Sequence, residues 1–199
     1  IRLSLVGSEM CIRDRRNICI YGIYGTAVAN SSTRNGESMQ AVILAAGFGK
    51  RMGSYKENPK ALLEIGGKPV IDHLLSFIAE EESVERVNIR TNALYYPLFR
   101  EWLKRSDFTG LVQLCANGAS CAEEALGAVG DLEDVCSRQG IADDVLVMAA
   151  DNIFDFSLRS FCLFADSVEG DVVAVSETAD REALKRGGVI TITAGDRVI

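Results

Sequence analysis

The sequence has few residues suited to zinc binding and no long apolar run. Its single histidine, His73, and its six cysteines, which include no Cys-x-x-Cys pair, argue against a tetrahedral zinc site. We expect His73 to be structural and the cysteines to be reduced, half-buried thiols of a cytoplasmic protein. No apolar stretch approaches the roughly 20 residues that a membrane-spanning helix needs, so no membrane partner is expected.

Basic residues are also fewer than acidic ones. The chain has 21 Lys and Arg residues against 28 Asp and Glu residues, which gives a formal net charge of -7. The surface as a whole should therefore repel nucleic acid, and a local cluster of cations and backbone N–H groups would have to hold any phosphate-bearing ligand. With 199 residues, 48% of them hydrophobic, the chain suits one soluble domain, and a homo-oligomer is compatible with it.

The N-terminal stretch lacks the regular pattern of the rest of the chain. Residues 4–15 resemble the translated read-through of a sequencing adapter, and residues 30–38 are polar and rich in Ser and Asn. We expect residues 1–38 to be a non-native or disordered extension, with Met39 as the natural start of the domain. A genuine additional N-terminal segment is the alternative. The chain stops in what resembles a hairpin turn, so we expect residues 39–199 to be incomplete at the C-terminus.

From Met39 onwards, short apolar runs typical of buried strands alternate with segments of helical periodicity. This alternation predicts right-handed βαβ crossovers and a mainly parallel sheet covered on both faces. In such sheets ligands bind at the carboxyl ends of the strands. The predicted strands are residues 40–46, 86–91, 111–115, 145–150, 172–176 and 189–193, and the predicted helices are residues 69–82, 95–105, 123–138 and 158–165.

A glycine-rich loop follows the first predicted strand, with the sequence Leu44-Ala45-Ala46-Gly47-Phe48-Gly49-Lys50-Arg51-Met52. Its small residues allow close approach of a ligand to the backbone, whose N–H groups can bind an anion. A Walker loop would need a hydroxyl residue where Arg51 stands, and in a dinucleotide fingerprint the third glycine would come one residue before Gly53. The nucleotidyltransferase signature L-A-A-G-x-G-T/S-R-L/M matches everywhere except at Lys50. A plain tight turn is the remaining alternative.

A second motif lies downstream, where Pro59-Lys60 is followed at fixed distance by Gly67-Lys68-Pro69. With these two motifs the chain resembles the sugar-phosphate nucleotidyltransferase family, whose members include glucose-1-phosphate thymidylyltransferases. The resemblance implies an α/β fold, a Rossmann-like three-layer α/β/α sandwich with a mainly parallel mixed sheet. Residues 39–199 would then be an incomplete nucleotidyltransferase domain.

The resemblance also implies a reaction and its site residues. The family transfers a nucleoside monophosphate from a nucleoside triphosphate to a sugar 1-phosphate, with Mg²⁺ as cofactor, and releases pyrophosphate. Carried over by motif, the catalytic residues are Arg51 and Lys60, the metal ligand is Asp151 and the sugar-binding residue is Gly188. The nucleotide-binding residues are Ala45, Ala46, Gly47, Gly49 and Gly127.

Some positions depart from the family pattern. Ala122 stands where the family often has Gln or Asn to read the base edge, and Asn117 or Gly118 could compensate from the preceding loop. Gly187 replaces a tyrosine beside the sugar. Base and sugar therefore stay open, and the alternative for Asp151 is a helix N-cap.

Other classes of function compete with this interpretation. A regulatory subunit could bind nucleotide sugars without catalysis, although intact Arg51, Lys60 and Asp151 argue against it. A nucleotidyltransferase could also act on a non-sugar phosphate, such as an alditol phosphate or a cofactor precursor. A dinucleotide oxidoreductase lacks the required glycine spacing and an acidic residue at the end of the second strand.

Overall fold

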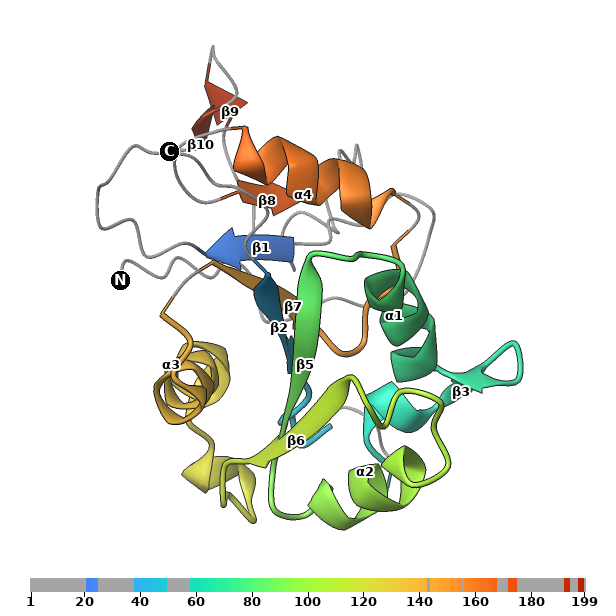
Figure 1. The fold of residues 1–199 in the computed structure, drawn as a ribbon. Helices are drawn as coiled ribbons and strands as arrows, with labels where there is room; N and C mark the ends of the chain where they lie inside the picture. Colours follow the sequence, from blue (N-terminus) through green and yellow to red (C-terminus); the bar gives the residue numbers. More distant parts are fainter. Residues whose placement is uncertain are drawn as a thin grey trace.

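A six-stranded sheet forms the centre of the protein (Figure 1). The computed structural model describes residues 21–24, 38–49, 58–142, 144–154, 156–167, 172–174, 192–193 and 197–198. In spatial order, the strands of the sheet are β6 (Val112–Ala116), β5 (Val84–Thr91), β2 (Met39–Leu44), β7 (Val145–Ala149), β1 (Tyr21–Tyr24) and β8 (Val172–Ala174).

The sheet is mainly parallel, as the sequence predicts. β6, β5, β2 and β7 run parallel to one another, whereas β1 runs antiparallel to both β7 and β8. β1 pairs Gly22 with Val147 on one side and with Val173 on the other. Four residues of the segment 1–38 thus take part in the sheet, while most of that segment lies outside the described residues. Its assignment as an extension stays a prediction.

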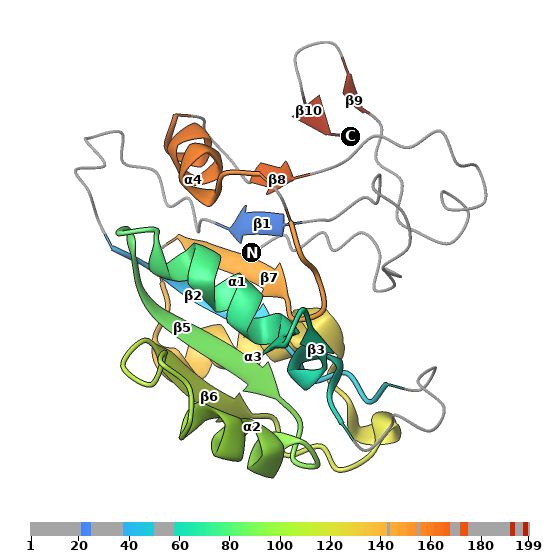
Figure 2. The ribbon, with the colours of Figure 1, turned by 90° about the vertical axis from the view of Figure 1, so that its right-hand side faces the viewer.

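Helices cover both faces of the sheet. α1 (Val70–Ala79), α2 (Tyr96–Leu103) and α4 (Leu158–Asp166) lie on one face, and α3 (Gly127–Gln139) lies on the other (Figures 1 and 2). Because side chains alternate along a strand, neighbouring residues of β2 enter different cores: Ile43 packs towards α1 and Val42 packs with Leu132 of α3. The predicted three-layer α/β/α sandwich is confirmed. Among the described residues, no helix has the length and apolar character to cross a membrane.

Several predicted boundaries shift by a few residues. The predicted helix 69–82 is shorter at both ends: Pro69 pairs with Glu64 in a small hairpin before α1, and α1 ends at Ala79. The predicted helix 123–138 divides into a 3-10 turn and α3, which ends at the left-handed Gly140 (φ 65°). The minor elements are η2 (Lys60–Leu62), β3 (Glu64–Ile65), β4 (Lys68–Pro69), η3 (Ala122–Glu124), β9 (Ile192–Thr193) and β10 (Arg197–Val198).

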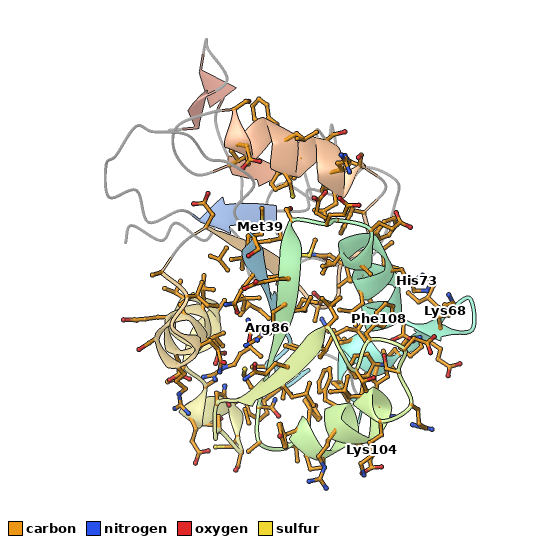
Figure 3. All side chains as sticks on the ribbon, viewed as in Figure 1. Met39, Lys68, His73, Arg86, Lys104 and Phe108 are labelled. Atoms are coloured by element: carbon orange, nitrogen blue, oxygen red, sulfur yellow. The ribbon has the colours of Figure 1, made fainter. Side chains whose placement is uncertain are left out.

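His73 has a structural role, as expected. It lies on α1 beside the β3–β4 hairpin (Figure 3), and its Nε2 lies 2.9 Å from the carbonyl oxygen of Ile65. This hydrogen bond ties the hairpin to the helix that follows it.

The order of the strands reverses between β2 and β7. From β2 the chain passes through α1 to β5 and through α2 to β6, always outwards in the same direction. It then returns through α3 on the opposite face and places β7 on the other side of β2. In open α/β sheets, the crevice for ligands lies at the carboxyl ends of the strands where the order reverses. Here those ends are Leu44 and Ala149, which are paired.

Candidate functional site

Two residues expected to serve one ligand lie in contact at this reversal point. Lys60 Nζ donates a hydrogen bond to Asp151 Oδ2 at 3.1 Å, although the two residues are 91 positions apart. Their side chains are 40% and 34% exposed, so the ion pair borders solvent. The structure therefore brings together a cation and a carboxylate that the sequence assigned to phosphate and metal binding.

The local sequence explains why Lys60 faces outwards. Pro59 is extended (φ -65°, ψ 140°) and its carbonyl accepts the N–H of Leu62, which starts the single turn η2. Ala61, the next residue after Lys60, is buried in the core below α1. Because Ala61 holds the turn against the core, Lys60 projects from it towards Asp151.

Asp151 is held by the strand that precedes it and by buried residues that follow. The N–H of Ala150 donates to the carbonyl of Leu44, which extends the pairing of β7 with β2 beyond the strand ends. Asn152 and Phe154 are both buried. The alternative N-cap role does not apply, because α4 begins at Leu158 and Ser157 Oγ caps it by accepting from Ser160.

The first residues of the glycine-rich loop are fixed by β5. The N–H of Ala45 donates to the carbonyl of Arg90 at 2.7 Å, and the carbonyl of the buried Ala46 accepts from Asn92 Nδ2 at 3.0 Å. Gly47 then emerges into open space, since a Cβ added there would meet no heavy atom within 4 Å beyond its chain neighbours. Gly49 has a positive φ of 58°, which favours glycine.

The remaining site predictions fall in two groups. Gly127 is the exposed first residue of α3, and its positive φ of 75° favours glycine. It lies at the carboxyl edge of the sheet, because the segment 117–126 leads to it from the end of β6. Arg51 and Gly188 lie outside the described residues, so their roles stay predictions.

A buried arginine beside the site was missed by the sequence analysis. The side chain of Arg90 is 1% exposed, and its Nε donates to Asp131 Oδ1 at 2.8 Å. The guanidinium also forms an ion pair with Asp134, one turn further along α3. A charged residue in a strand of a sheet covered on both faces needs a buried partner, and two aspartates three positions apart on one predicted helix were the available signal.

Asn117, a candidate for reading the base edge, is held by hydrogen bonds within the protein. Its Nδ2 donates to Asp131 Oδ1 at 2.9 Å, and its Oδ1 accepts from the N–H of Ala119 at 3.0 Å. The amide is therefore occupied at both ends by this loop and by α3.

The charges around Arg90 shift one carboxyl group. Partial burial acts to raise the pKa of Asp134, but hydrogen bonding and the positive charges of Arg138 and Arg90 outweigh it and lower that pKa below its usual value. Asp134 thus stays ionised beside the guanidinium at neutral pH.

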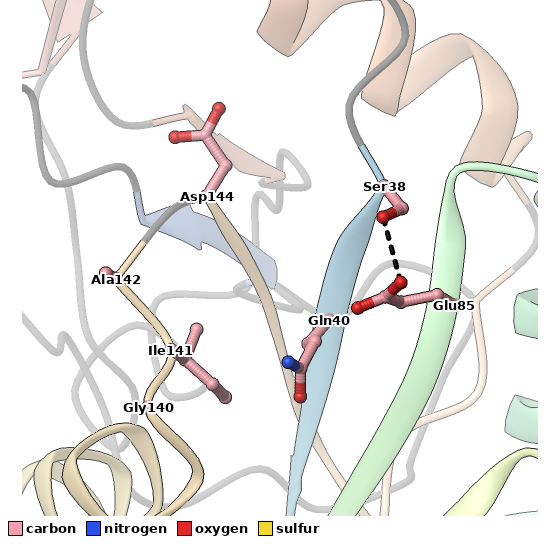
Figure 4. Close-up of a pocket in the computed structure, with 7 residues that line it drawn as sticks. All are labelled: Ser38, Gln40, Glu85, Gly140, Ile141, Ala142 and Asp144. Atoms are coloured by element: carbon pink, nitrogen blue, oxygen red, sulfur yellow. Dashed lines mark hydrogen bonds between the residues drawn. The ribbon is translucent and has the colours of Figure 1, made fainter.

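A small pocket lies at the opposite end of the sheet, beside the amino ends of β2, β5 and β7 (Figure 4). Its volume is about 60 Å³, and Glu85 accepts a hydrogen bond there from Ser38 Oγ at 2.9 Å. Asp144 brings a second carboxylate, so the pocket is too small and too acidic for a triphosphate. The candidate site is therefore the edge that carries Lys60 and Asp151.

Comparisons with known proteins identify the family to which the chain is similar. Residues 41–185 match the family described as MobA-like NTP transferase domain. The chain is 31% identical over 107 residues to a 2-C-methyl-D-erythritol 4-phosphate cytidylyltransferase of Chlorobaculum tepidum, covering 54% of this chain and 44% of that protein. It is 28% identical over 163 residues to a bifunctional enzyme IspD/IspF of Chelativorans sp., covering 81% of this chain and 38% of that protein. The matches span less than half the length of these relatives.

Solved structures show the same fold. A Bacillus anthracis protein assigned as a glucose-1-phosphate thymidylyltransferase superposes with a TM-score of 0.53 at 20% identity, covering 66% of this chain and 52% of that chain. The inositol-1-phosphate CTP transferase from T. maritima superposes with a TM-score of 0.50 at 19% identity, covering 64% and 48%. At these identities the likeness establishes the architecture alone.

Proposed function

Because the chain belongs to the MobA-like NTP transferase family, we propose that it transfers a nucleoside monophosphate from a nucleoside triphosphate to a sugar 1-phosphate. The products are a nucleoside diphosphate sugar and pyrophosphate. One observation carries the proposal: Lys60 and Asp151 meet at the strand-order reversal, beside the loop that begins at Ala45. A cation and a carboxylate in contact at a ligand crevice suit a phosphate group and its counter-ion.

The reaction is a substitution at phosphorus. An oxygen of the acceptor phosphate forms a bond to the α-phosphorus, and the bond from that phosphorus to the oxygen bridging to the β-phosphorus breaks. The nucleophile is already anionic, so no general base has to remove a proton. The barrier is mainly electrostatic, because two polyanions approach and negative charge grows on the pyrophosphate that leaves.

The residues of the site supply positive charge and N–H donors to the phosphates. Lys60 neutralises the α-phosphate, and Arg51 stabilises the pyrophosphoryl group. Backbone N–H groups of the loop that contains Gly47 and Gly49 cradle the phosphates, with Ala45 and Ala46 holding the start of that loop against the sheet. Gly127 packs against the base, and Gly188 lies near the sugar.

The donor set fits a metal that is carried largely by the nucleotide. Among the described residues, no group of three or more His, Cys, Asp or Glu side chains could hold a metal. Asp151 supplies one carboxylate, and Mg²⁺ commonly takes one or two protein carboxylates together with phosphate oxygens and water. Bound there, Mg²⁺ would neutralise phosphate charge.

A non-sugar acceptor is the second candidate, and the relatives favour it. The Chlorobaculum tepidum protein is named for a cytidylyl transfer to 2-C-methyl-D-erythritol 4-phosphate, which is an alditol phosphate. The choice of a sugar rests on Gly188, which lies outside the described residues. Both candidates share the same attack of a phosphate oxygen on the α-phosphorus.

Pyrophosphate release tests the proposal. The protein is incubated with each of the four nucleoside triphosphates and with sugar 1-phosphates or polyol phosphates, with and without Mg²⁺. We expect release with one acceptor class only, and its loss in Lys60→Met and Asp151→Asn. Pyrophosphate release with polyol phosphates alone would show that the acceptor is a non-sugar phosphate, the second candidate, and not a sugar 1-phosphate. Nucleotide binding without release for any acceptor would make the protein a non-catalytic binding subunit.

A further inference from the structure

We propose that Arg90 is a positioning residue of the nucleotide site, whose buried ion pair with Asp131 fixes the start of α3 relative to the glycine-rich loop. This inference rests on the proposed function, in which Gly127 at the start of α3 contacts the base. Arg90 touches neither substrate nor metal in this proposal. It acts by joining the end of β5, which holds the start of the glycine-rich loop, to α3.

The side chain of Arg90 contacts the two elements that flank the base. Nε donates to Asp131 Oδ1 at 2.8 Å, and Nη1 donates to the carbonyl of Ala116 at 3.3 Å. Ala116 is the last residue of β6, and Asp131 belongs to α3. The guanidinium therefore fixes both ends of the segment 117–126 that leads from β6 to Gly127.

The backbone of the same residue holds the glycine-rich loop. The carbonyl of Arg90 accepts the N–H of Ala45, the first residue after β2. Two positions further on, Asn92 donates from Nδ2 to the carbonyl of Ala46. The end of β5 thus anchors the phosphate side of the site through its backbone and the base side through the Arg90 side chain.

The segment after β6 is bound to the same strand end and to the same aspartate. The N–H of Asn117 donates to the carbonyl of Thr91 at 3.0 Å, and that of Ala93 donates to Ala119 at 2.9 Å. The Asn117 amide donates to the Asp131 carboxylate, which accepts from Arg90 as well. One carboxylate therefore binds donors from two segments, which restricts the rotation and translation of α3.

Stability alone is a poor explanation of this arrangement. Replacing a buried ion pair by apolar residues of similar volume is often neutral or stabilising, and α3 already packs Leu132 and Val135 on the sheet. What the pair supplies is fixed geometry, because the planar guanidinium imposes the directions of its hydrogen bonds. Gly127 lies four positions before Asp131 on α3, about one helical turn. The position of Asp131 therefore sets the position of Gly127.

The experiment compares nucleotides with a probe that has no base. Dissociation constants are measured by calorimetry for the four nucleoside triphosphates and for inorganic tripolyphosphate, each with Mg²⁺. We expect Asp131→Asn to weaken binding of the preferred triphosphate on the order of tenfold, because the charge-assisted hydrogen bond from Arg90 becomes a weaker bond to a neutral amide oxygen. Discrimination among bases should fall, and the affinity for tripolyphosphate should be unchanged.

Two further variants isolate the effect. Arg138→Ala is the matched control. Arg138 contacts Asp134 from the exposed side of α3, with Nε 2.8 Å from Oδ1, and its removal leaves Arg90 and Asp131 paired. We expect its nucleotide affinities to equal those of the wild type. If Asp131→Asn does not fold, Asn117→Ala leaves the Arg90–Asp131 pair in place. It removes the second donor to the same carboxylate, together with the acceptor of the Ala119 N–H, and should show the same pattern with a smaller change.

The outcomes separate this inference from the proposed function. A wild type that binds no triphosphate overturns the proposed function itself. The positioning role of Arg90 is overturned in a different case. The wild type then binds triphosphate, and the folded variant either loses affinity for triphosphate and tripolyphosphate equally or keeps both affinities unchanged.

Discussion

Lys60 and Asp151 form a 3.1 Å ion pair in which the proposed ligand of the phosphate and the proposed ligand of the metal neutralise each other. Asp151 thus takes the place of the phosphate that Lys60 would bind, and Lys60 takes the place of the metal that Asp151 would bind. Binding of a triphosphate with its metal would exchange this one pair for two new ones, so the two charged groups are released together.

Removing Lys60 should therefore free Asp151 for cations. We expect Lys60→Met to tighten binding of Mn²⁺, measured by electron paramagnetic resonance without nucleotide, by about twofold to fivefold, the range for a solvent-bordering ion pair. The control is Lys104→Met. Lys104 is the C-cap residue of α2, and its Nζ forms an exposed ion pair with Glu101 Oε1 of the same helix at 2.7 Å. Equal Mn²⁺ affinity in Lys60→Met and wild type would show that the pair does not compete with a metal.

A methyl group at Gly47 should impair ligand binding without harming the fold. Gly47 has no positive φ, and a Cβ added there would meet no heavy atom within 4 Å. Gly110, in a turn after α2, has the same two properties and serves as the control. We expect both Gly→Ala variants to change the free energy of unfolding by less than about 0.5 kcal/mol. Only Gly47→Ala should weaken triphosphate binding in calorimetry. The same affinity in both variants would mean that the backbone at Gly47 does not approach the phosphates.

Arg51, identified by its motif alone, should act on the transition state. We expect Arg51→Ala to lower kcat on the order of 10²–10³, more than it raises KM, because it removes one group that stabilises charge on the leaving pyrophosphate. Steady-state kinetics of pyrophosphate release measure both constants. An unchanged rate in a folded variant would remove Arg51 from the catalytic residues.

Stability should fall in acid through Asp134. The pKa of this carboxyl is lowered in the folded protein, so its ionised form stabilises the fold above the unfolded pKa of about 3.9, and that contribution is lost as the pH falls through the folded value. We expect the melting temperature of Asp134→Asn to depend less on pH below about pH 5 than that of the wild type.

The control for this pH effect is Glu101→Gln. The pKa of Glu101 is also lowered, by a hydrogen bond from Lys104 and then by its charge, but the pair is exposed and screened by salt. Its effect on the acid transition should be smaller and should vanish at high ionic strength. Identical acid transitions in Asp134→Asn and wild type would contradict the role of the Arg90 network in acid stability.

Cysteine reactivity should differ sharply between two positions. Burial raises the pKa of the Cys162 thiol to about 12, and the charges of Glu81 and Asp166 add to the shift, whereas Cys121 is exposed in the segment after β6. The thiolate is the reactive form, so at pH 8 iodoacetamide should label Cys121 in the folded protein and Cys162 only after denaturation. Peptide mass spectrometry reads out each position. Comparable labelling of both in the native state would show that the core does not shield the face of α4 that carries Cys162.

The sequence by itself determined the alternation of strands and helices from Met39 onwards, and hence the three-layer sandwich. The periods of apolar residues are local properties, and so are the turn residues of the glycine-rich loop and the Pro59-Lys60 motif. These patterns placed Gly47, Lys60 and Asp151 at strand ends or in loops, and Gly127 in the predicted helix 123–138. They misjudged helix boundaries where a competing contact intervened, as in the pairing of Pro69 with Glu64.

Only the tertiary structure decided which of these positions are neighbours. Strand order is set by packing between segments far apart in the chain, so no local pattern shows that Lys60 meets Asp151 or that the end of β7 lies beside that of β2. The partnership of Arg90 with Asp131, and the occupied amide of Asn117, arise for the same reason. A polar group's role depends on whether burial forces it to find an internal partner, and burial is a property of the folded chain.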